Sequence, residues 1–165
     1  DDVEQYIPPK KGFQHALRVI RDTLISMPKG KGTNLQKCID FLIKVQKRTS
    51  IVFIISDFLA EPCGKELAIL AKKADVIGIH IVDSWETALP DVGLVDAIDP
   101  ETLEEITIDL SDERYRAWYR QEMAEKRTLW KKTFLKAGGH FVSIKTTESA
   151  VDALRKFFKF RKSRL

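Results

Sequence analysis

Asp57 is the residue of this sequence best placed to do chemistry. With Ser56, it directly follows residues 51–55, a run of five large apolar residues that predicts a strand buried on both faces of a sheet. In an open α/β sheet, the carboxyl ends of central strands face the crevice where ligands bind. An ionised carboxylate is costly to bury there unless it is paired, hydrogen-bonded or bound to a metal. The alternative is that Asp57 accepts hydrogen bonds within a turn or caps a helix.

Thr33 is a second candidate ligand, because it follows the glycine-rich stretch 28–32. A hydroxyl and a carboxylate that converge with other oxygens make a site for a hard cation, and Mg²⁺ usually keeps waters and only one or two protein carboxylates. Two ligands bind weakly, and the sequence offers no obvious third. Thr33 and Asp57 therefore predict an incomplete metal site, with their neighbours Asn34 and Ser56 as further binding residues.

Catalysis is the competing hypothesis, and it rests on Asp83. This aspartate closes a second apolar run, 76–82, so Asp57 and Asp83 would lie at neighbouring strand ends, as in metal-dependent hydrolases and phosphotransfer enzymes. Residues 83–86 offer no nucleophile with a partnered base, however, and the sequence has neither a G-x-G-x-x-G nor a Walker loop. His80, inside the apolar run, is expected to be a hydrogen-bonded core histidine.

Asp83 and Glu86 are instead expected to be structural. We expect them to organise the turn after the second buried strand and to lead Trp85 back onto the core. Ser111 is expected to be the N-cap of a long helix, with Asp112 and Glu113 favourable at the positive end of its dipole.

The elements that must position these residues alternate along the chain. Strands are predicted where apolar runs are short and helices where apolar residues recur every three or four positions. The predicted strands are the end of one at 3–7, then 51–56, 76–82, a hairpin of 93–98 and 103–110 that turns at 99–101, and 141–144. The predicted helices are 12–26, one from Thr33 as cap to 47, 65–73, one from Ser111 to 136, and one capped by Thr147. This alternation predicts a Rossmann-like three-layer α/β/α sandwich with a mostly parallel sheet.

Two helices carry clear apolar stripes. Phe13, Leu17, Ile20 and Leu24 share one side of the first helix. In the second, the residues predicted to point inward are Leu35, Cys38, Ile39, Leu42 and Val45. Cys38 and Cys63 are expected to be buried small apolar groups and not a disulfide.

Composition limits the function classes. The 165 residues suit one domain with a real core. The formal net charge is +4, but the last eleven residues hold six cations and no acid, which leaves 22 basic against 24 acidic groups elsewhere. The charge therefore does not indicate a nucleic-acid-binding face. No run approaches the roughly 20 apolar residues that span a bilayer.

Four motifs in the same order resemble the uncharacterised bacterial family known as domain of unknown function 58. They are residues 6–12 (YIPPKKG), 32–35 (GTNL), 55–58 (ISDF) and 82–86 (VDSWE), the last followed by Leu89 and Pro90. The resemblance covers the whole chain. It implies a von Willebrand factor type A-like domain, whose metal-ion-dependent adhesion site takes most of its ligands from an Asp-x-Ser-x-Ser motif.

The resemblance assigns the remaining two ligand roles to Thr33 and Asp57. The Asp-x-Ser-x-Ser motif is absent from this sequence, so residues 1–165 are expected to be a single truncated domain that lacks the first strand and helix. Mg²⁺ is then expected in the full-length protein and not in this chain.

The implied function is a non-catalytic protein-interaction module. The resemblance adds a MoxR-type AAA+ ATPase as a partner in assembling or activating other proteins, and a cytoplasmic location with membrane segments in the full-length protein. A missing central strand would also leave residues 51–56 as an exposed apolar edge, so we expect the chain to self-associate there.

Overall fold

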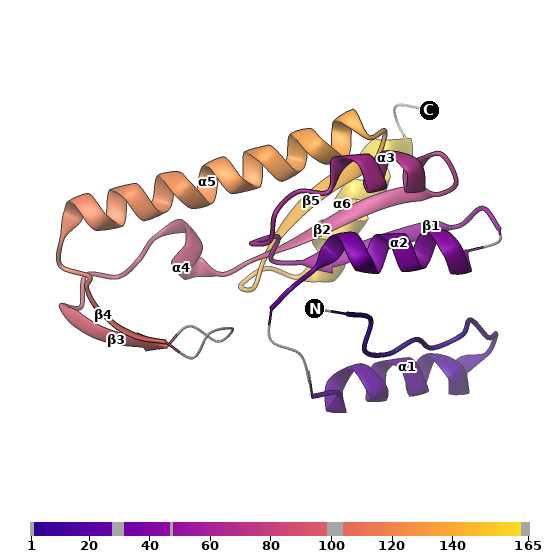
Figure 1. Ribbon diagram of the computed structural model, residues 1–165, viewed down its shortest axis with the longest axis horizontal. Coiled ribbons are helices and arrows are strands. Elements are labelled where there is room, and N and C mark those ends of the chain that lie inside the picture. Colours follow the sequence, from indigo (N-terminus) through magenta and orange to yellow (C-terminus); the bar gives the residue numbers. More distant parts are fainter. Residues whose placement is uncertain (1, 28–31, 47, 99–103, 163–165) are drawn as a thin grey trace.

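The computed structural model describes residues 2–27, 32–46, 48–98 and 104–162. Helices and strands alternate along most of this length (Figure 1). In chain order they are α1 (Phe13–Ile25), α2 (Leu35–Val45), β1 (Ile51–Ser56), α3 (Gly64–Ala71), β2 (Asp75–Val82), α4 (Ser84–Thr87), β3 (Leu94–Ile98), β4 (Glu105–Asp109), α5 (Glu113–Lys136), β5 (His140–Lys145) and α6 (Ala150–Lys162). No helix in the described ranges has the length and apolar character that crossing a membrane requires.

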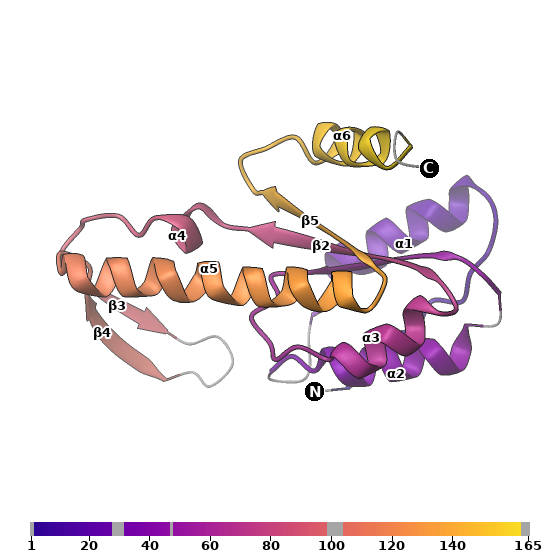
Figure 2. The same cartoon turned by 90° about the horizontal axis from the view of Figure 1, so that it is seen from above.

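The main sheet has three parallel strands in the order β1-β2-β5. Phe53 of β1 lies beside Ile77 of β2, and Ile79 of β2 lies beside Val142 of β5. Helices pack on both faces of the sheet (Figure 2). The predicted α/β class, with a parallel sheet between helical layers, is therefore confirmed.

The two faces of the sheet carry separate clusters of buried apolar side chains. One cluster joins β1 and β2 to helices α2, α3 and α5, and its members include Val52, Val76, Leu67, Leu70, Trp130 and Phe134. The other joins Ile77 and Ile79 of β2 and Ile144 of β5 to α6, through Leu154 and Phe157. Three helices thus cover one face, and α6 alone covers β2 and β5 on the other.

Strand β1 is where the prediction of burial on both faces is wrong. Ile51, Phe53 and Ile55 are 55%, 44% and 65% exposed, because α6 packs mainly on β2 and β5. Phe158 of α6 contacts Phe53 of β1, with the ring centroids 6.3 Å apart. Among the described residues, β1 pairs with β2 and with no second strand. The apolar run is therefore an edge strand with one covered face.

Phe134 fixes how α5 lies on the sheet. Its ring packs over Gly78 of β2, where an added Cβ would approach within 2.7 Å of the ring. Two residues downstream of α5's last turn, Gly138 has φ +86° and Gly139 donates its N–H to the Phe134 carbonyl at 2.9 Å. The N–H of Gly138 bonds the Leu135 carbonyl at 3.1 Å, which completes a Schellman motif. The predicted break at these two glycines is confirmed.

An arm extends beyond the sheet (Figure 1). It consists of α4 and the antiparallel β3–β4 hairpin, and it is joined to the first half of α5, a helix of 24 residues and so about 36 Å long. The predicted hairpin is confirmed, and its turn at 99–101 lies outside the described residues. The cap of α5 is Asp112, whose carboxylate accepts from Arg114 N at 2.8 Å. Ser111 instead bonds the Asp109 carboxylate, so its prediction as the cap is wrong.

The N-terminal segment departs furthest from prediction. Residues 3–7 are not a strand; Tyr6 packs its ring on Phe41 of α2, with the ring centroids 5.3 Å apart. Helix α1 forms as predicted, but its stripe of Phe13, Leu17, Ile20 and Leu24 is exposed. The helix lies off the β1 edge of the sheet, and in the described part of the chain no residue buries that stripe.

Two smaller predictions also need correction. Cys38 is exposed on α2, because Ile39 and not Cys38 faces the core; Cys63 is buried and both thiols are free. The residue that caps α6 is Ser149, which accepts from Asp152 N at 3.3 Å, and not Thr147. The turn at 146–149 places the start of α6 at Ala150, two residues later than a cap at Thr147 would place it.

Candidate functional site

The three parallel strands end at one edge of the sheet, and this edge holds the predicted site residues. Ser56 is the last residue of β1 and Asp57 comes directly after it, while Asp83 comes directly after β2. Helix α2 begins on the same side (Figure 1), so Thr33 and Asn34, which immediately precede it, reach the edge where Asp57 lies. Residues far apart in the sequence are thus brought to one end of the fold.

The turn after β1 is held by its own polar side chains. Ser56 Oγ accepts from Phe58 N at 3.0 Å, and Asp57 Oδ1 accepts from Leu59 N at 3.3 Å. Phe58 adopts φ +54°, the left-handed region that a bulky residue rarely occupies. Such strain persists only where the surroundings impose it, and it concentrates at functional sites.

Phe58 tolerates this backbone because its ring is fully buried. It contacts four other rings, with centroid distances of 4.8 Å to Trp130, 5.3 Å to Phe141, 5.5 Å to Phe134 and 5.9 Å to His80. Trp130 also donates its indole N–H to the Ala60 carbonyl at 3.0 Å. The buried cluster thereby fixes the turn and leaves the Asp57 side chain exposed. The sequence marks Asp57 but gives no sign of the strained Phe58.

His80 is the buried titratable group of this edge. Its Nδ1 lies 3.2 Å from Ser143 Oγ of β5, as expected for a hydrogen-bonded core histidine. Burial, helped by the positive charge of Arg127, lowers its pKa; a hydrogen bond to the Asp57 backbone and the Asp57 charge oppose the shift. His80 Nε2 lies 3.8 Å from Glu86 Oε2, too far for a hydrogen bond. The imidazole is therefore neutral at pH 7.

Asp83 and Glu86 form a capping box at the start of α4. Asp83 Oδ1 accepts from Trp85 N at 2.8 Å, and Glu86 Oε1 accepts from Asp83 N at 2.9 Å. Burial raises the pKa of Glu86, and the charges of Asp57 and Asp83 add to the shift. The predicted turn-organising role is confirmed. The expectation for Trp85 is wrong, since it is half exposed, because α4 leads into the arm and away from the core.

At the start of α2 the helix cap is Asn34 and not the predicted Thr33. The N-cap of α2 is Asn34, whose Oδ1 accepts from Lys37 N at 3.0 Å, so Thr33 is not the cap. Thr33 precedes the cap and is exposed, which is compatible with a ligand role. The Asn34 side-chain oxygen is occupied by the helix, and this weakens the prediction that it binds a ligand.

The donor set at this edge falls short of a full cation site. In the described part of the chain, no group of three or more His, Cys, Asp or Glu side chains is arranged to hold a metal ion. Asp57 supplies one carboxylate, and Thr33 and Ser56 supply hydroxyls. A hard cation needs six or more oxygens, with waters filling the rest. These residues could contribute to a metal centre and could not make one alone.

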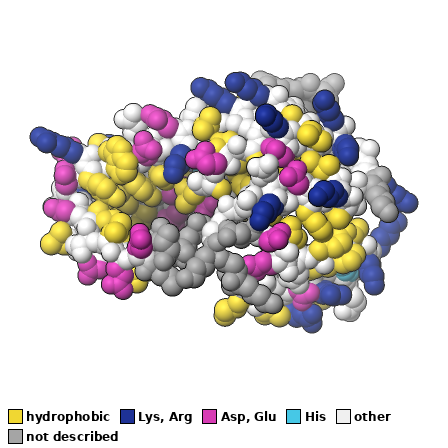
Figure 3. Space-filling model, in the orientation of Figure 1, with side chains coloured by type: hydrophobic (Ala, Val, Ile, Leu, Met, Phe, Trp, Pro, Cys, Tyr) yellow, Lys and Arg dark blue, Asp and Glu magenta, His cyan; other side chains and the backbone are white. Residues whose placement is uncertain are grey.

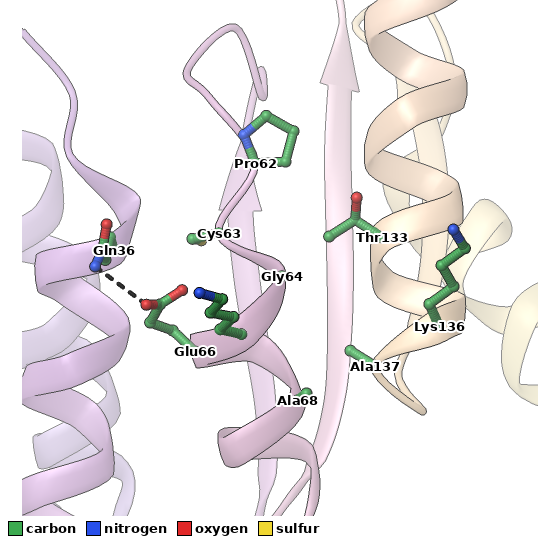
Figure 4. A pocket seen from close by; sticks show the side chains of 10 residues that line it. Gln36, Pro62, Cys63, Gly64, Glu66, Ala68, Thr133, Lys136 and Ala137 are labelled. Atoms are coloured by element: carbon green, nitrogen blue, oxygen red, sulfur yellow. Dashed lines mark hydrogen bonds between the residues drawn. The ribbon is translucent and has the colours of Figure 1, made fainter.

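A hollow of about 670 Å³ lies between α2, α3 and α5 (Figure 4). Gln36 donates to Glu66 across it at 3.1 Å, and Thr133 and Lys136 line it from α5. Cys63 is its one thiol among the described residues, and burial raises the pKa of Cys63 to about 11. A thiol that stays protonated is a poor nucleophile, so Cys63 is not suited to that role in the hollow.

A family model described as "Protein of unknown function DUF58" matches residues 1–129. This chain belongs to the DUF58 family. The match spans the turn at Asp57, the capping box and most of α5. The resemblance drawn from the four sequence motifs is therefore confirmed at the level of the family, which carries no assigned activity.

Relatives of this DUF58 chain are mycobacterial and uncharacterised. The uncharacterized protein Rv1480 of Mycobacterium tuberculosis is 29% identical over 164 residues, which cover 94% of this chain and 50% of that protein. The uncharacterized protein MAV169 of Mycobacterium avium is 27% identical over 161 residues, covering 93% of each. The chain thus spans about half the length of Rv1480. No solved structure matches it.

Proposed function

We propose that this DUF58 chain is a non-catalytic protein-interaction module with a von Willebrand factor type A-like organisation. It would present Asp57 to a protein partner, together with Thr33 and Ser56. The family resemblance suggests a MoxR-type AAA+ ATPase as that partner, acting with this protein on the cytoplasmic side to assemble or activate other proteins.

The observation that carries the proposal is the strained turn at Phe58. Backbone strain of this kind costs of order 1–3 kcal/mol, which a turn without a function has no reason to retain. Here four rings around Phe58, three of them buried, hold the strain, and the result is an exposed carboxylate in a fixed position. A rigid, accessible acid suits binding, either directly to a cationic group or through a shared metal ion.

The alternative, a hydrolase or phosphotransfer enzyme using Asp57 and Asp83, has less support. The Asp83 carboxylate accepts the Trp85 N–H through Oδ1 in the capping box, which ties this residue to the start of α4 and gives it a structural role. His80 is neutral and buried, with its Nδ1 on Ser143, and is poorly placed to act as a general base for an external substrate.

A divalent cation fits this proposal only in part. Thr33 and Asp57 would supply two ligands of an adhesion-type site, and the remaining ligands would come from sequence outside this chain or from the partner. We therefore expect this chain alone to bind Mg²⁺ or Mn²⁺ weakly or not at all by isothermal titration calorimetry. Tight, stoichiometric binding would contradict the split site.

The experiment compares the wild-type chain with Asp57→Ala and, as a matched control, Glu125→Ala, an exposed acid on α5. Binding to a purified MoxR-type ATPase is measured by biolayer interferometry, with Mg²⁺ and with EDTA. Hydrolysis of p-nitrophenyl phosphate and bis(p-nitrophenyl) phosphate is followed in the same buffers with Mg²⁺ or Mn²⁺.

We expect Asp57→Ala to weaken binding at least tenfold, Glu125→Ala to leave it unchanged, and neither substrate to be turned over. Phosphoester hydrolysis that is lost in both Asp57→Ala and Asp83→Ala would establish the enzyme instead. Binding that is equal in wild type and Asp57→Ala would show that the turn is not the contact.

A further inference from the structure

The charges of this chain are divided between two regions. Residues 83–113, here called the acidic arm, contain eleven Asp and Glu and no Lys, Arg or His. Because the chain has 24 acidic and 28 basic side chains, the rest of it holds 13 acids and all 28 bases. Figure 3 shows acidic side chains around the hairpin, and most of the lysine and arginine side chains toward the other end. The division is visible in the sequence as a run of 31 residues with acids and no bases, although the net charge of the chain is +4.

The outer face of the β3–β4 hairpin is uncovered. The register places six side chains on that face, and all are exposed: Leu94, Asp96, Ile98, Glu105, Thr107 and Asp109. Leu94 and Ile98 are 74% and 60% exposed. Neither buried apolar cluster of the described chain includes a residue of β3 or β4. Two large apolar groups and three carboxylates thus share one flat surface.

Helix α6 has the complementary chemistry. Four of its cations, Arg155, Lys156, Lys159 and Lys162, are exposed, and so are Val151, Phe158 and Phe160 between them. A groove of about 510 Å³ runs beside the helix, lined by Val142, Lys156 and Phe160 and also by two acids, Glu148 and Asp152. α6 lies over one side of the sheet and the hairpin lies far from it, at one end of the molecule (Figure 2), so one chain does not bring them together.

We propose that the outer face of the β3–β4 hairpin docks on α6 of a second copy of this chain. Leu94 and Ile98 would pack against the apolar side chains of α6, while Asp96, Glu105 and Asp109 would face its lysines and arginine. Apolar contact supplies affinity, and the complementary charges set orientation and exclude like-charged pairing. This interaction is separate from the partner surface at Asp57.

The contact is heterologous, because each copy uses a different surface from its partner. Every copy therefore keeps one free arm and one free α6, and association continues head to tail into rings or open chains. Charge pairing at a surface is screened by salt, so the assembly should dissociate as ionic strength rises.

The test uses two charge variants and their mixture. The arm variant is Leu94→Lys/Glu105→Lys, and the α6 variant is Lys156→Glu/Lys159→Glu, all four at exposed positions. Lys72→Glu/Lys73→Glu, beyond the end of α3, is the control with the same charge change as the α6 variant. Weight-average mass is measured by light scattering at low and high salt, and melting followed by circular dichroism checks that each variant folds.

We expect the wild type and the control to exceed the monomer mass of 18.9 kDa at low salt and to lose mass at high salt. Each variant alone should have a lower mass that no longer depends on salt. Their equimolar mixture should regain mass, because the intact arm of one meets the intact α6 of the other. A mixture mass equal to the average of the two variants, or a wild-type mass that salt does not change, would overturn the proposal.

Discussion

The two faces of the main sheet carry the same kinds of apolar side chains, but these side chains are buried to different extents on the two faces. On the face toward α2, α3 and α5, Val52, Val76 and Phe134 are buried. On the face toward α6, Ile77 is buried while Phe53, its neighbour across the β1–β2 register, is nearly half exposed. The strand sequences do not explain this difference in burial. It is explained by the number of helices that cover each face.

The largest contrast between the faces should appear when a phenylalanine is truncated on each. Phe134→Ala removes a fully buried ring between Gly78, Phe58 and Phe141, and we expect it to lower the free energy of unfolding by about 3–5 kcal/mol. Phe53→Ala should cost about 1 kcal/mol or less, because much of its ring is already in water. Urea denaturation compares the two, and equal losses would show that α6 covers β1 in solution.

A methyl group added to the well-covered face should be the next most damaging change. In Gly78→Ala the new Cβ would come within 2.7 Å of the Phe134 ring, and we expect a loss of about 1–3 kcal/mol. The double variant Gly78→Ala/Phe134→Leu should cost less than the two single changes added together, since the smaller side chain relieves the clash. If the double variant instead loses the sum of the two single losses in urea denaturation, the cost of Gly78→Ala does not come from a clash with the Phe134 ring.

At the end of that face, the capping box contributes a smaller amount. Glu86→Ala removes the acceptor of the Asp83 N–H, and we expect the free energy of unfolding to fall by about 1 kcal/mol. The melting temperature should fall, while the metal affinity of the full-length protein stays unchanged. Glu61→Ala, an exposed acid, is the control. A lost metal site with unchanged melting would reverse the assignment.

His80 should give the face covered by α2, α3 and α5 a pH-dependent stability. Its pKa is lowered in the fold, so below its ordinary value of 6.5 the unfolded chain binds more protons than the folded chain. Stability is then present at neutral pH and falls as the pH drops through this range. The raised pKa of Glu86 acts in the opposite sense, adding stability at low pH that is lost as the pH rises. Urea midpoints should decline less between about pH 7.5 and about pH 5.5 in His80→Gln than in wild type; identical declines would contradict this role.

The smallest effect on stability should come from the exposed face of β1. Ile55→Lys should change the free energy of unfolding by no more than about 0.5 kcal/mol. It should nevertheless lower the mass seen by light scattering at high salt, where edge pairing through β1 persists and charge contacts do not. Ile69→Lys on α3 is the control. A wild-type chain that is monomeric at high salt would show that β1 does not pair.

These comparisons separate what the sequence predicts from what it does not. The β2 and β5 strands, helices α2 and α5, and the break at Gly138 follow from local patterns, because short apolar runs, helical periodicity and glycines act over a few residues. The exposure of β1 and of the α1 stripe could not be predicted, since burial depends on which other element arrives. Asp57 was marked by its strand end, but the turn that holds it depends on Trp130, more than seventy residues away.

The long helix α5 also gives this molecule a mechanical property. Its C-terminal half is clamped in the core by Trp130 and Phe134, and its N-terminal half extends outward with the hairpin. From Trp130 to the start of α5 the helix is about 26 Å long, so a tilt of roughly 5° at the clamp moves the far end by about 2 Å. The clamp includes the ring that packs on Phe58 and bonds Ala60. Force applied to the hairpin therefore acts, through a stiff lever, on the backbone that carries Asp57.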